Sequence, residues 1–192
     1  MNVQPPRRLF IGLLPARDVQ VQVHRHAAAW DWPPAARPTR FGRYHLTLNF
    51  LGEVALAPEQ RLRAALRQIA MEPLELVLDH AMLWRQGVAV LRPGQHPGLH
   101  DLWERIADCV RQAGLVATAS FTPHLTLARD AYGAVPPGAA PAIHWPVREF
   151  VLVWSRLDTK PAQYVAVETF GVKQGTVLRL ASQQAGVQGD LF

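Results

Sequence analysis

The stretch His45-Leu46-Thr47-Leu48 recurs unchanged 79 residues later, at positions 124–127, and the two copies are the strongest guide to the fold. Each copy lies in an apolar setting typical of a β-strand. Residues two apart in a strand point to the same side, so each copy puts one imidazole and one hydroxyl on one face and two leucines on the other. Two such strands side by side would gather two histidines and two threonines around one pocket.

His45 and His124 have the chemistry of an acid–base pair. The ordinary pKa of histidine lies near neutrality, so one imidazole can be neutral while the other is protonated. A phosphodiester needs both, because its attacking and departing oxygens lie on opposite sides of phosphorus, and each proton transfer typically adds about 10²–10⁴-fold to the rate. Thr47 and Thr126 can donate hydroxyls to the non-bridging oxygens, where charge builds in the transition state. Arg129 follows the second motif and can add a positive charge, with an ordinary surface role as the alternative.

The composition is compatible with one domain that binds phosphate. Of the 192 residues, 49% are hydrophobic, which is enough for a core, and the net charge is +5. Eighteen of the 20 basic residues are arginine, whose planar fork matches phosphate oxygens. A GC-rich genome explains the same bias, so the charge is only weak support for a nucleic-acid partner. We expect residues 1–175 to form a single bilobal domain and residues 176–192 a C-terminal tail.

Other residues give no sign of a metal, a disulfide or a membrane span. Cys109 is the only cysteine and is expected to be an inert core thiol. His24 and His26 point apart on an expected helix, and a Pro-Gly pair interrupts the spacing of His96 and His100. The chain has no long apolar run and no secretory signal, which favours the cytoplasm. We expect a monomer without metal or cofactor.

Hydrophobic periodicity predicts an α+β fold with largely antiparallel strands. Strands are expected at 8–14, 44–51, 121–128, 149–157 and 164–169, a hairpin at 74–83 and 88–91, and helices at 18–30, 58–70 and 99–113. Loops are expected at 33–43 and 132–146, and Gly52-Glu53 is expected to stop the first motif strand.

The two motifs fall on corresponding strands of two roughly similar halves. We therefore expect a two-lobed arrangement of sheets with the helices outside and the motifs meeting at a central cleft. Trp30, Trp32 and Trp145 lie at loop edges, where they either join the core or stack on a base.

Both His-x-Thr motifs have distinctive neighbours. Phe50-Leu51-Gly52-Glu53 follows the first, whereas Phe121-Thr122-Pro123 precedes the second. Together with residues 8–11, Arg129 and residues 152–157, these motifs resemble the bacterial and archaeal RNA 2′,3′-cyclic phosphodiesterases. These proteins are also called 2′-5′ RNA ligase-like proteins and belong to the two-histidine phosphoesterases. The resemblance spans roughly residues 8–172.

The resemblance implies hydrolysis of a 2′,3′-cyclic phosphate on RNA or a nucleotide to a 2′-phosphate. It makes His45 and His124 the catalytic pair, with His124 activating water and His45 protonating the departing 3′ oxygen. Thr47 and Thr126 would hold the phosphate, and Arg129 would contact the substrate. The alternatives are another ester, such as ADP-ribose 1″,2″-cyclic phosphate or 2′-5′ oligonucleotides, reversible 2′-5′ RNA ligation, or RNA-end binding without turnover.

Overall fold

The computed structural model describes residues 5–156, 159 and 163–171. The strands are β1 (Arg7–Leu13), β2 (Arg37–Pro38), β3 (Leu46–Val54), β4 (Leu74–Trp84), β5 (Val88–Pro93), β6 (Leu125–Arg129), β7 (Ile143–Val147), β8 (Glu149–Arg156) and β9 (Gln163–Gly171). The helices are α1 (Arg17–Ala28), α2 (Leu56–Leu66) and α3 (Pro97–Gln112). Over these residues, nine strands form one sheet in the order β7-β4-β5-β6-β3-β1-β8-β9, with β2 paired to β6.

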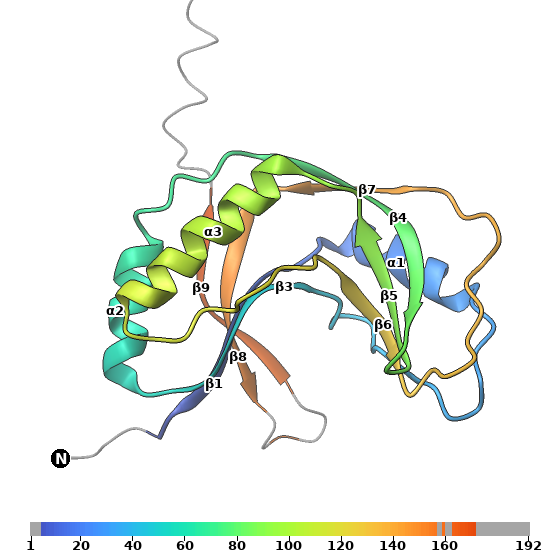
Figure 1. Ribbon diagram of the computed structural model, residues 1–192, viewed down its shortest axis with the longest axis horizontal. Helices are drawn as coiled ribbons and strands as arrows, with labels where there is room; N and C mark the ends of the chain where they lie inside the picture. The colour runs from blue at the N-terminus through green and yellow to red at the C-terminus, as the bar shows by residue number, and fades with distance from the viewer. Residues whose placement is uncertain (1–4, 157–158, 160–162, 172–192) are drawn as a thin grey trace, which may run out of the picture.

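The sheet has two lobes that meet at the two motif strands. We call β3, β1, β8 and β9 the first lobe, and β6, β5, β4 and β7 the second lobe. They join where Leu46 of β3 pairs antiparallel with Leu125 of β6. Figure 1 shows α2 and α3 at the end of the molecule that holds the first lobe. The predicted two-lobed α+β fold with antiparallel strands is confirmed.

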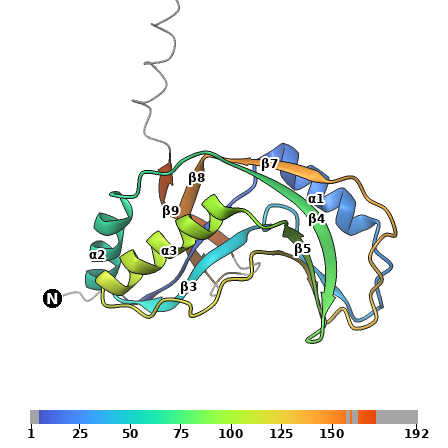
Figure 2. The same cartoon turned by 45° about the horizontal axis from the view of Figure 1, so that its top comes forward.

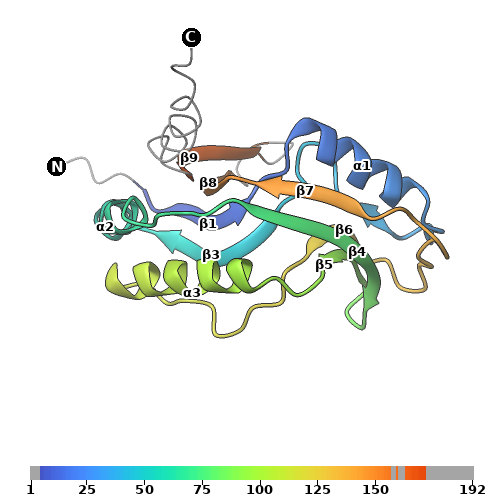
Figure 3. The same ribbon diagram turned by 90° about the horizontal axis from the view of Figure 1, so that it is seen from above.

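The helices pack on different lobes. Helix α3 packs along β3, as Figure 2 shows, and also contacts α2. Helix α1 packs beside β7, on the opposite side of the molecule from α3 in Figure 3. None of the helices in the described residues is long and apolar enough to cross a membrane.

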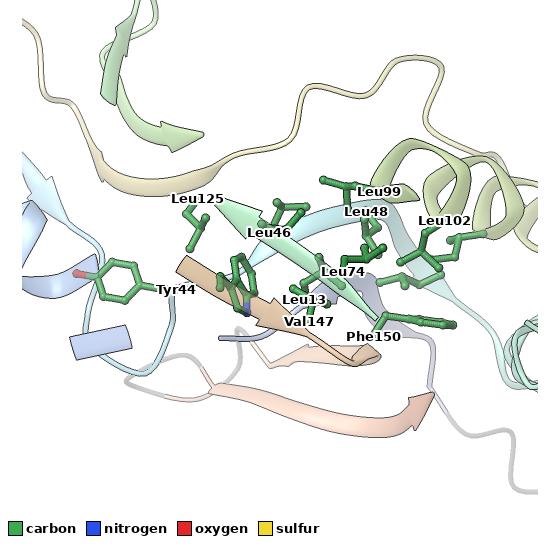
Figure 4. Packing of buried hydrophobic residues seen from close by; sticks show 14 of the residues in the cluster. Leu13, Tyr44, Leu46, Leu48, Leu74, Leu99, Leu102, Leu125, Val147 and Phe150 are labelled. Atoms are coloured by element: carbon green, nitrogen blue, oxygen red, sulfur yellow. The ribbon is translucent and has the colours of Figure 1, made fainter. Parts of the chain in front are cut away.

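Alternate residues of β1 point to different faces of the sheet, as strand geometry requires. Leu9 and Ile11 join the main core, which also contains the leucines of both motifs, such as Leu46 in Figure 4. Phe10 points to the other face, where it packs with Val153 in a small second cluster. The first face therefore supplies most of the burial, and the second face is left to form a cavity.

Strand β3 continues through Gly52-Glu53, where we predicted that it would stop. Gly52 has a φ of 68°, and the pairing of β3 with β1 skips Leu51 next to it. A glycine in the left-handed region lets a strand take up an extra residue as a bulge. The prediction was wrong because this glycine distorts the strand without ending it.

Strand β2 lies inside one segment that we predicted to be a loop, 33–43, and strand β7 overlaps the end of the other, 132–146. The burial of Ile143, Trp145 and Val147 alternates as in a strand, but Pro146 and the prolines before it hide that pattern. Strand β7 is at the edge of the sheet, the position where proline is tolerated because fewer ladder hydrogen bonds are needed.

Helix α3 begins two residues earlier than predicted because His96 caps it. The backbone N–H of Leu99 donates to Nδ1 of His96 at 3.3 Å, and Pro97 stands in the first turn, where its missing N–H costs nothing. Cys109 on this helix is buried, as expected of a core thiol. The predicted tail, 176–192, and the predicted domain boundary at 175 lie outside the described residues.

Candidate active site

The two motifs come together where the lobes join. Leu46 and Leu125, the residues between histidine and threonine in each motif, are antiparallel partners. Both leucines point into the core and are fully buried. The histidines and threonines on either side of them therefore share the opposite face, as the strand period predicted. Both histidines immediately precede the first residue of their strands.

One cavity of about 640 Å³ contains all five residues that the sequence singled out. Five of its lining side chains are arginines, and none of its described lining residues is acidic. The lining residues are Arg8, Phe10, Arg37, Pro38, Thr39, Arg40, Arg43, His45, Thr47, Phe50, His124, Thr126, Arg129, Ser155 and Tyr164. Such a concentration of guanidinium groups around two imidazoles suits an anionic ligand.

Each imidazole is oriented by the same local hydrogen bond. Nδ1 of His45 lies 2.9 Å from the carbonyl oxygen of Arg43, and Nδ1 of His124 lies 2.8 Å from that of Thr122. A carbonyl only accepts hydrogen bonds, so Nδ1 carries the proton and donates in both rings. The neutral ring then has its lone pair on Nε2. Each histidine thus has one nitrogen held by its own backbone and one free for proton transfer.

Burial and neighbouring cations lower the pKa of both histidines. Desolvation is the largest cause at His45, and the charges of His124, Arg43 and Arg129 lower its pKa further. Desolvation also leads at His124, with added lowering from Arg129 and Arg92. A bound phosphate anion opposes these effects, because a nearby negative charge favours the protonated ring. The cavity therefore favours neutral imidazoles until an anion enters.

Aromatic rings hold the two histidines on separate sides. The ring of His45 packs against Phe10 at 4.9 Å and edge-on against Tyr164 at 5.2 Å between centroids. The guanidinium of Arg43 lies 4.5 Å from the centre of the Tyr164 ring. The ring of His124 packs instead against Trp84, at 4.6 Å. These contacts limit the rotation of both imidazoles.

Sequence reasoning did not single out Tyr164 or Trp84 for the site. The tryptophans it considered lie elsewhere: Trp30 and Trp145 are buried, and Trp32 stacks on Trp30 at 5.0 Å. Of the two roles expected for these three tryptophans, the structure therefore supports a place in the core over stacking on a base. The one sequence signal for Trp84 was its position beside the predicted hairpin turn. The sequence alone does not show that this turn lies next to the second motif.

Arg129 lies at the end of β6 and lines the same cavity as both histidines. It pairs in register with Arg37 of β2, and Arg37 is held by an ion pair of 2.5 Å with Asp130. The two-residue strand β2 thus carries the arginine-rich segment before the first motif to the edge of the site. Within the described residues, no three histidine, cysteine or acidic side chains are grouped to hold a metal ion.

A family model described as the 2′-5′ RNA ligase superfamily matches residues 19–159. The chain belongs to this superfamily. It is 34% identical over 177 residues to the RNA 2′,3′-cyclic phosphodiesterase of Escherichia coli K12, covering 88% of this chain and 98% of that protein.

Solved structures agree with membership of the 2′-5′ RNA ligase superfamily. The crystal structure of Escherichia coli LigT complexed with phosphate has a TM-score of 0.75 and 32% identity, covering 89% of this chain and 100% of that chain. The structure of LigT complexed with 3′-AMP has a TM-score of 0.74 and 29% identity, covering 88% of this chain and 99% of that chain.

Proposed function

We propose that this protein hydrolyses 2′,3′-cyclic phosphates at RNA ends or on nucleotides and leaves a 2′-phosphate. The observation that carries the proposal is the single basic cavity lined by both His-x-Thr motifs. The related Escherichia coli protein is named for this activity, and its structures in complex with phosphate and with 3′-AMP support a nucleotide phosphate as ligand.

The lining of two adjoining cavities supports different roles for the two histidines. His45 lines only the basic cavity. His124 lines both this cavity and a second one, of about 590 Å³, which also shares Thr47 and Phe50. A terminal nucleotide suits the basic cavity because its phosphodiester chain is negatively charged. The second cavity is then the approach for water, next to His124.

The reaction balances with one proton taken and one given. Nε2 of His124 accepts a proton from water as the bond from water oxygen to phosphorus forms. Nε2 of His45 gives a proton to O3′ as the bond between phosphorus and O3′ breaks. Burial lowers the pKa of His124, and Arg92 lowers it further without acting on His45, which favours the unprotonated form that the base needs. The phosphate anion raises the pKa of His45 on binding, which favours the protonated form that the acid needs.

Thr47 and Thr126 are proposed to donate hydroxyls to the two non-bridging oxygens, and Arg129 to neutralise their charge. Donors aimed at a developing negative charge typically contribute about 10²–10³-fold each. No step requires a metal ion, because the acid, the base and the charge-stabilising groups all come from the chain.

The test is incubation with the four nucleoside 2′,3′-cyclic phosphates, with and without EDTA, followed by separation of 2′- from 3′-phosphate products. We expect 2′-phosphates in both conditions. His45→Ala and His124→Ala should each lower kcat/KM by about 10²–10⁴-fold. His144→Ala is the matched control, because His144 is exposed on the edge strand β7, away from the cavity. Near-normal turnover by either motif variant, or 3′-phosphate products, would contradict the proposal.

A further inference from the structure

The segment between strand β2 and the first motif forms one wall of the basic cavity. Residues 37–40 and Arg43 line the cavity, whereas the two residues between them do not. Strand β2 fixes the start of this segment on β6, and the backbone N–H of Thr39 donates to the carbonyl oxygen of Leu127 at 2.8 Å. The wall is therefore attached to the strand that carries the second motif.

A tight turn ends this wall and carries Phe41 at its tip. The backbone N–H of Arg43 donates to the carbonyl oxygen of Arg40 at 3.0 Å, and Gly42 has a φ of 83°. A glycine in the left-handed region at the third position is characteristic of a type II turn. Arg40 and Arg43 line the cavity while Phe41 is 42% exposed, so the Phe41 ring lies at the outer rim of the cavity.

Contacts with helix α1 hold the ring of Phe41. The guanidinium of Arg17 lies 5.9 Å from the centre of the ring, and the ring of His24 packs edge-on against it at 5.8 Å. His24 is itself held by Tyr44, whose hydroxyl lies 3.2 Å from Nδ1. A lone exposed aromatic residue is ordinary on a protein surface. A fixed ring at the rim of an arginine-lined cavity instead combines a stacking surface with positive charge, the two features that bind single-stranded nucleic acid.

Arg40 differs from the other four arginines of the basic cavity. Three of those engage a carboxylate or an aromatic ring of the protein, in the pairs Arg37–Asp130, Arg43–Tyr164 and Arg8–Phe50. The fourth, Arg129, is proposed to act on the reacting phosphate. Among the described residues, the side chain of Arg40 has neither an acidic partner nor an aromatic ring beneath it. Its charge is therefore available to a further phosphate.

We infer that the turn at residues 40–43 binds the penultimate nucleotide of an RNA, with the base stacked on Phe41 and the linking phosphodiester on Arg40. The inference rests on the proposed hydrolysis of a 2′,3′-cyclic phosphate, and it makes an RNA end a better substrate than a cyclic mononucleotide. The terminal nucleotide occupies the basic cavity, and its 5′ oxygen carries the phosphodiester that leads out. The cavity on the other side of His124 has a single arginine, so the negative chain is drawn toward the turn.

The experiment compares cytidine 2′,3′-cyclic phosphate with the dinucleotide adenylyl-(3′-5′)-cytidine 2′,3′-cyclic phosphate. The measure is the ratio of kcat/KM for the dinucleotide to kcat/KM for the mononucleotide, because a general loss of catalytic power leaves this ratio unchanged. We expect a ratio of at least about tenfold in wild-type protein, expressed in KM, since the turn lies away from the reacting atoms. A ratio near one overturns the inference.

Substitutions at Phe41 test the stacking. Phe41→Ala should lower the ratio at least about fivefold, the low end of what one stacked base contributes, and Phe41→Trp should keep the wild-type ratio or raise it. Leu56→Ala is the matched control, because Leu56 is 39% exposed on α2 and does not line the basic cavity. An equal ratio in Phe41→Ala and Leu56→Ala overturns the assignment of the base.

A neutral linkage tests the role of Arg40. Arg40→Gln should lower the ratio about tenfold for the natural dinucleotide, as expected for a hydrogen bond between charged groups. It should leave the ratio unchanged for a dinucleotide whose linking phosphate is an uncharged methylphosphonate. An equal loss with both linkages overturns the contact between Arg40 and the phosphodiester.

Failure of the proposed function is distinguishable, because neither substrate is then hydrolysed. Calorimetry with cytidine 2′-phosphate and with adenylyl-(3′-5′)-cytidine 2′-phosphate decides the inference in that case. Tighter binding of the dinucleotide that Phe41→Ala abolishes and Leu56→Ala retains supports the site. Equal binding of the two ligands by wild-type protein, or an advantage of the dinucleotide that Phe41→Ala retains, overturns it.

Discussion

Gly12 lies where an added methyl group would press directly on the first motif. It pairs with Thr47 of β3, and a Cβ at this position would lie 2.7 Å from the carbonyl oxygen of Leu46 and 3.3 Å from the ring of Phe10. Restoring an ordinary carbon–oxygen separation displaces that carbonyl by roughly 0.3–0.7 Å. The displaced group lies between His45 and Thr47, so the Gly12→Ala change tests whether the spacing of these two side chains matters.

Two effects of Gly12→Ala follow from this geometry. Overpacking typically costs about 1–3 kcal/mol, and the smaller entropy of the unfolded alanine chain returns about 0.4–1 kcal/mol. For a chain of this size, a net loss of about 1–2 kcal/mol lowers Tm by roughly 2–8 °C. A misplacement of 1 Å in an active site can cost about 10²-fold, so half of that displacement should lower kcat/KM roughly tenfold.

Gly94→Ala is the matched control, because a Cβ at Gly94 meets nothing within 4 Å. It should unfold at the wild-type temperature or slightly above, with unchanged turnover of a cyclic phosphate. Thermal unfolding followed by circular dichroism and steady-state kinetics measure both effects. If Gly12→Ala matches Gly94→Ala in Tm and in kcat/KM, the close approach of β1 to the first motif does not constrain the site.

Two further predictions concern titration and thiol chemistry. Burial lowers the pKa of both motif histidines. Arg92 lowers the pKa of His124 further but not that of His45, whereas Arg43 lowers the pKa of His45 further but not that of His124. Arg92→Gln should therefore move only the acidic limb of the pH profile of kcat/KM to higher pH, and Arg43→Gln only the alkaline limb. If Arg92→Gln instead moved the alkaline limb and Arg43→Gln the acidic limb, His124 would be the acid and His45 the base. Burial raises the pKa of the Cys109 thiol, so it should react with a thiol reagent much more slowly in native than in unfolded protein; equal rates would place it at the surface.

The core of the site could be predicted because it depends on a local pattern repeated twice. The strand period fixes which side chains share a face, so His45 and Thr47 had to lie together, as did His124 and Thr126. The identical motifs also suggested that the two strands occupy matching places. Leu46 of the first motif pairs with Leu125 of the second, as that expectation requires. Any offset of this register would have moved the two motifs apart.

The surroundings of the site could not be predicted because they depend on contacts between distant segments. Arg37 reaches the cavity through the two-residue strand β2, which has too few residues to show a pattern. Tyr164 and Trp84 come from different lobes, on strands whose neighbours are set by the topology of the whole sheet. Pro146 hid the edge strand β7, since proline is an ordinary mark of a loop and is acceptable in a strand only at an edge.

The path of the chain through the sheet has a consequence for the integrity of the protein. The chain begins with β1 in the first lobe, crosses to the second for α1 and β2, and returns to the first for β3. It then adds β4 to β7 to the second lobe and returns once more to the first for β8 and β9, so the two halves are interleaved along the chain. A single cut by a protease cannot release either half with all its strands, and neither half alone carries more than one of the two motif histidines.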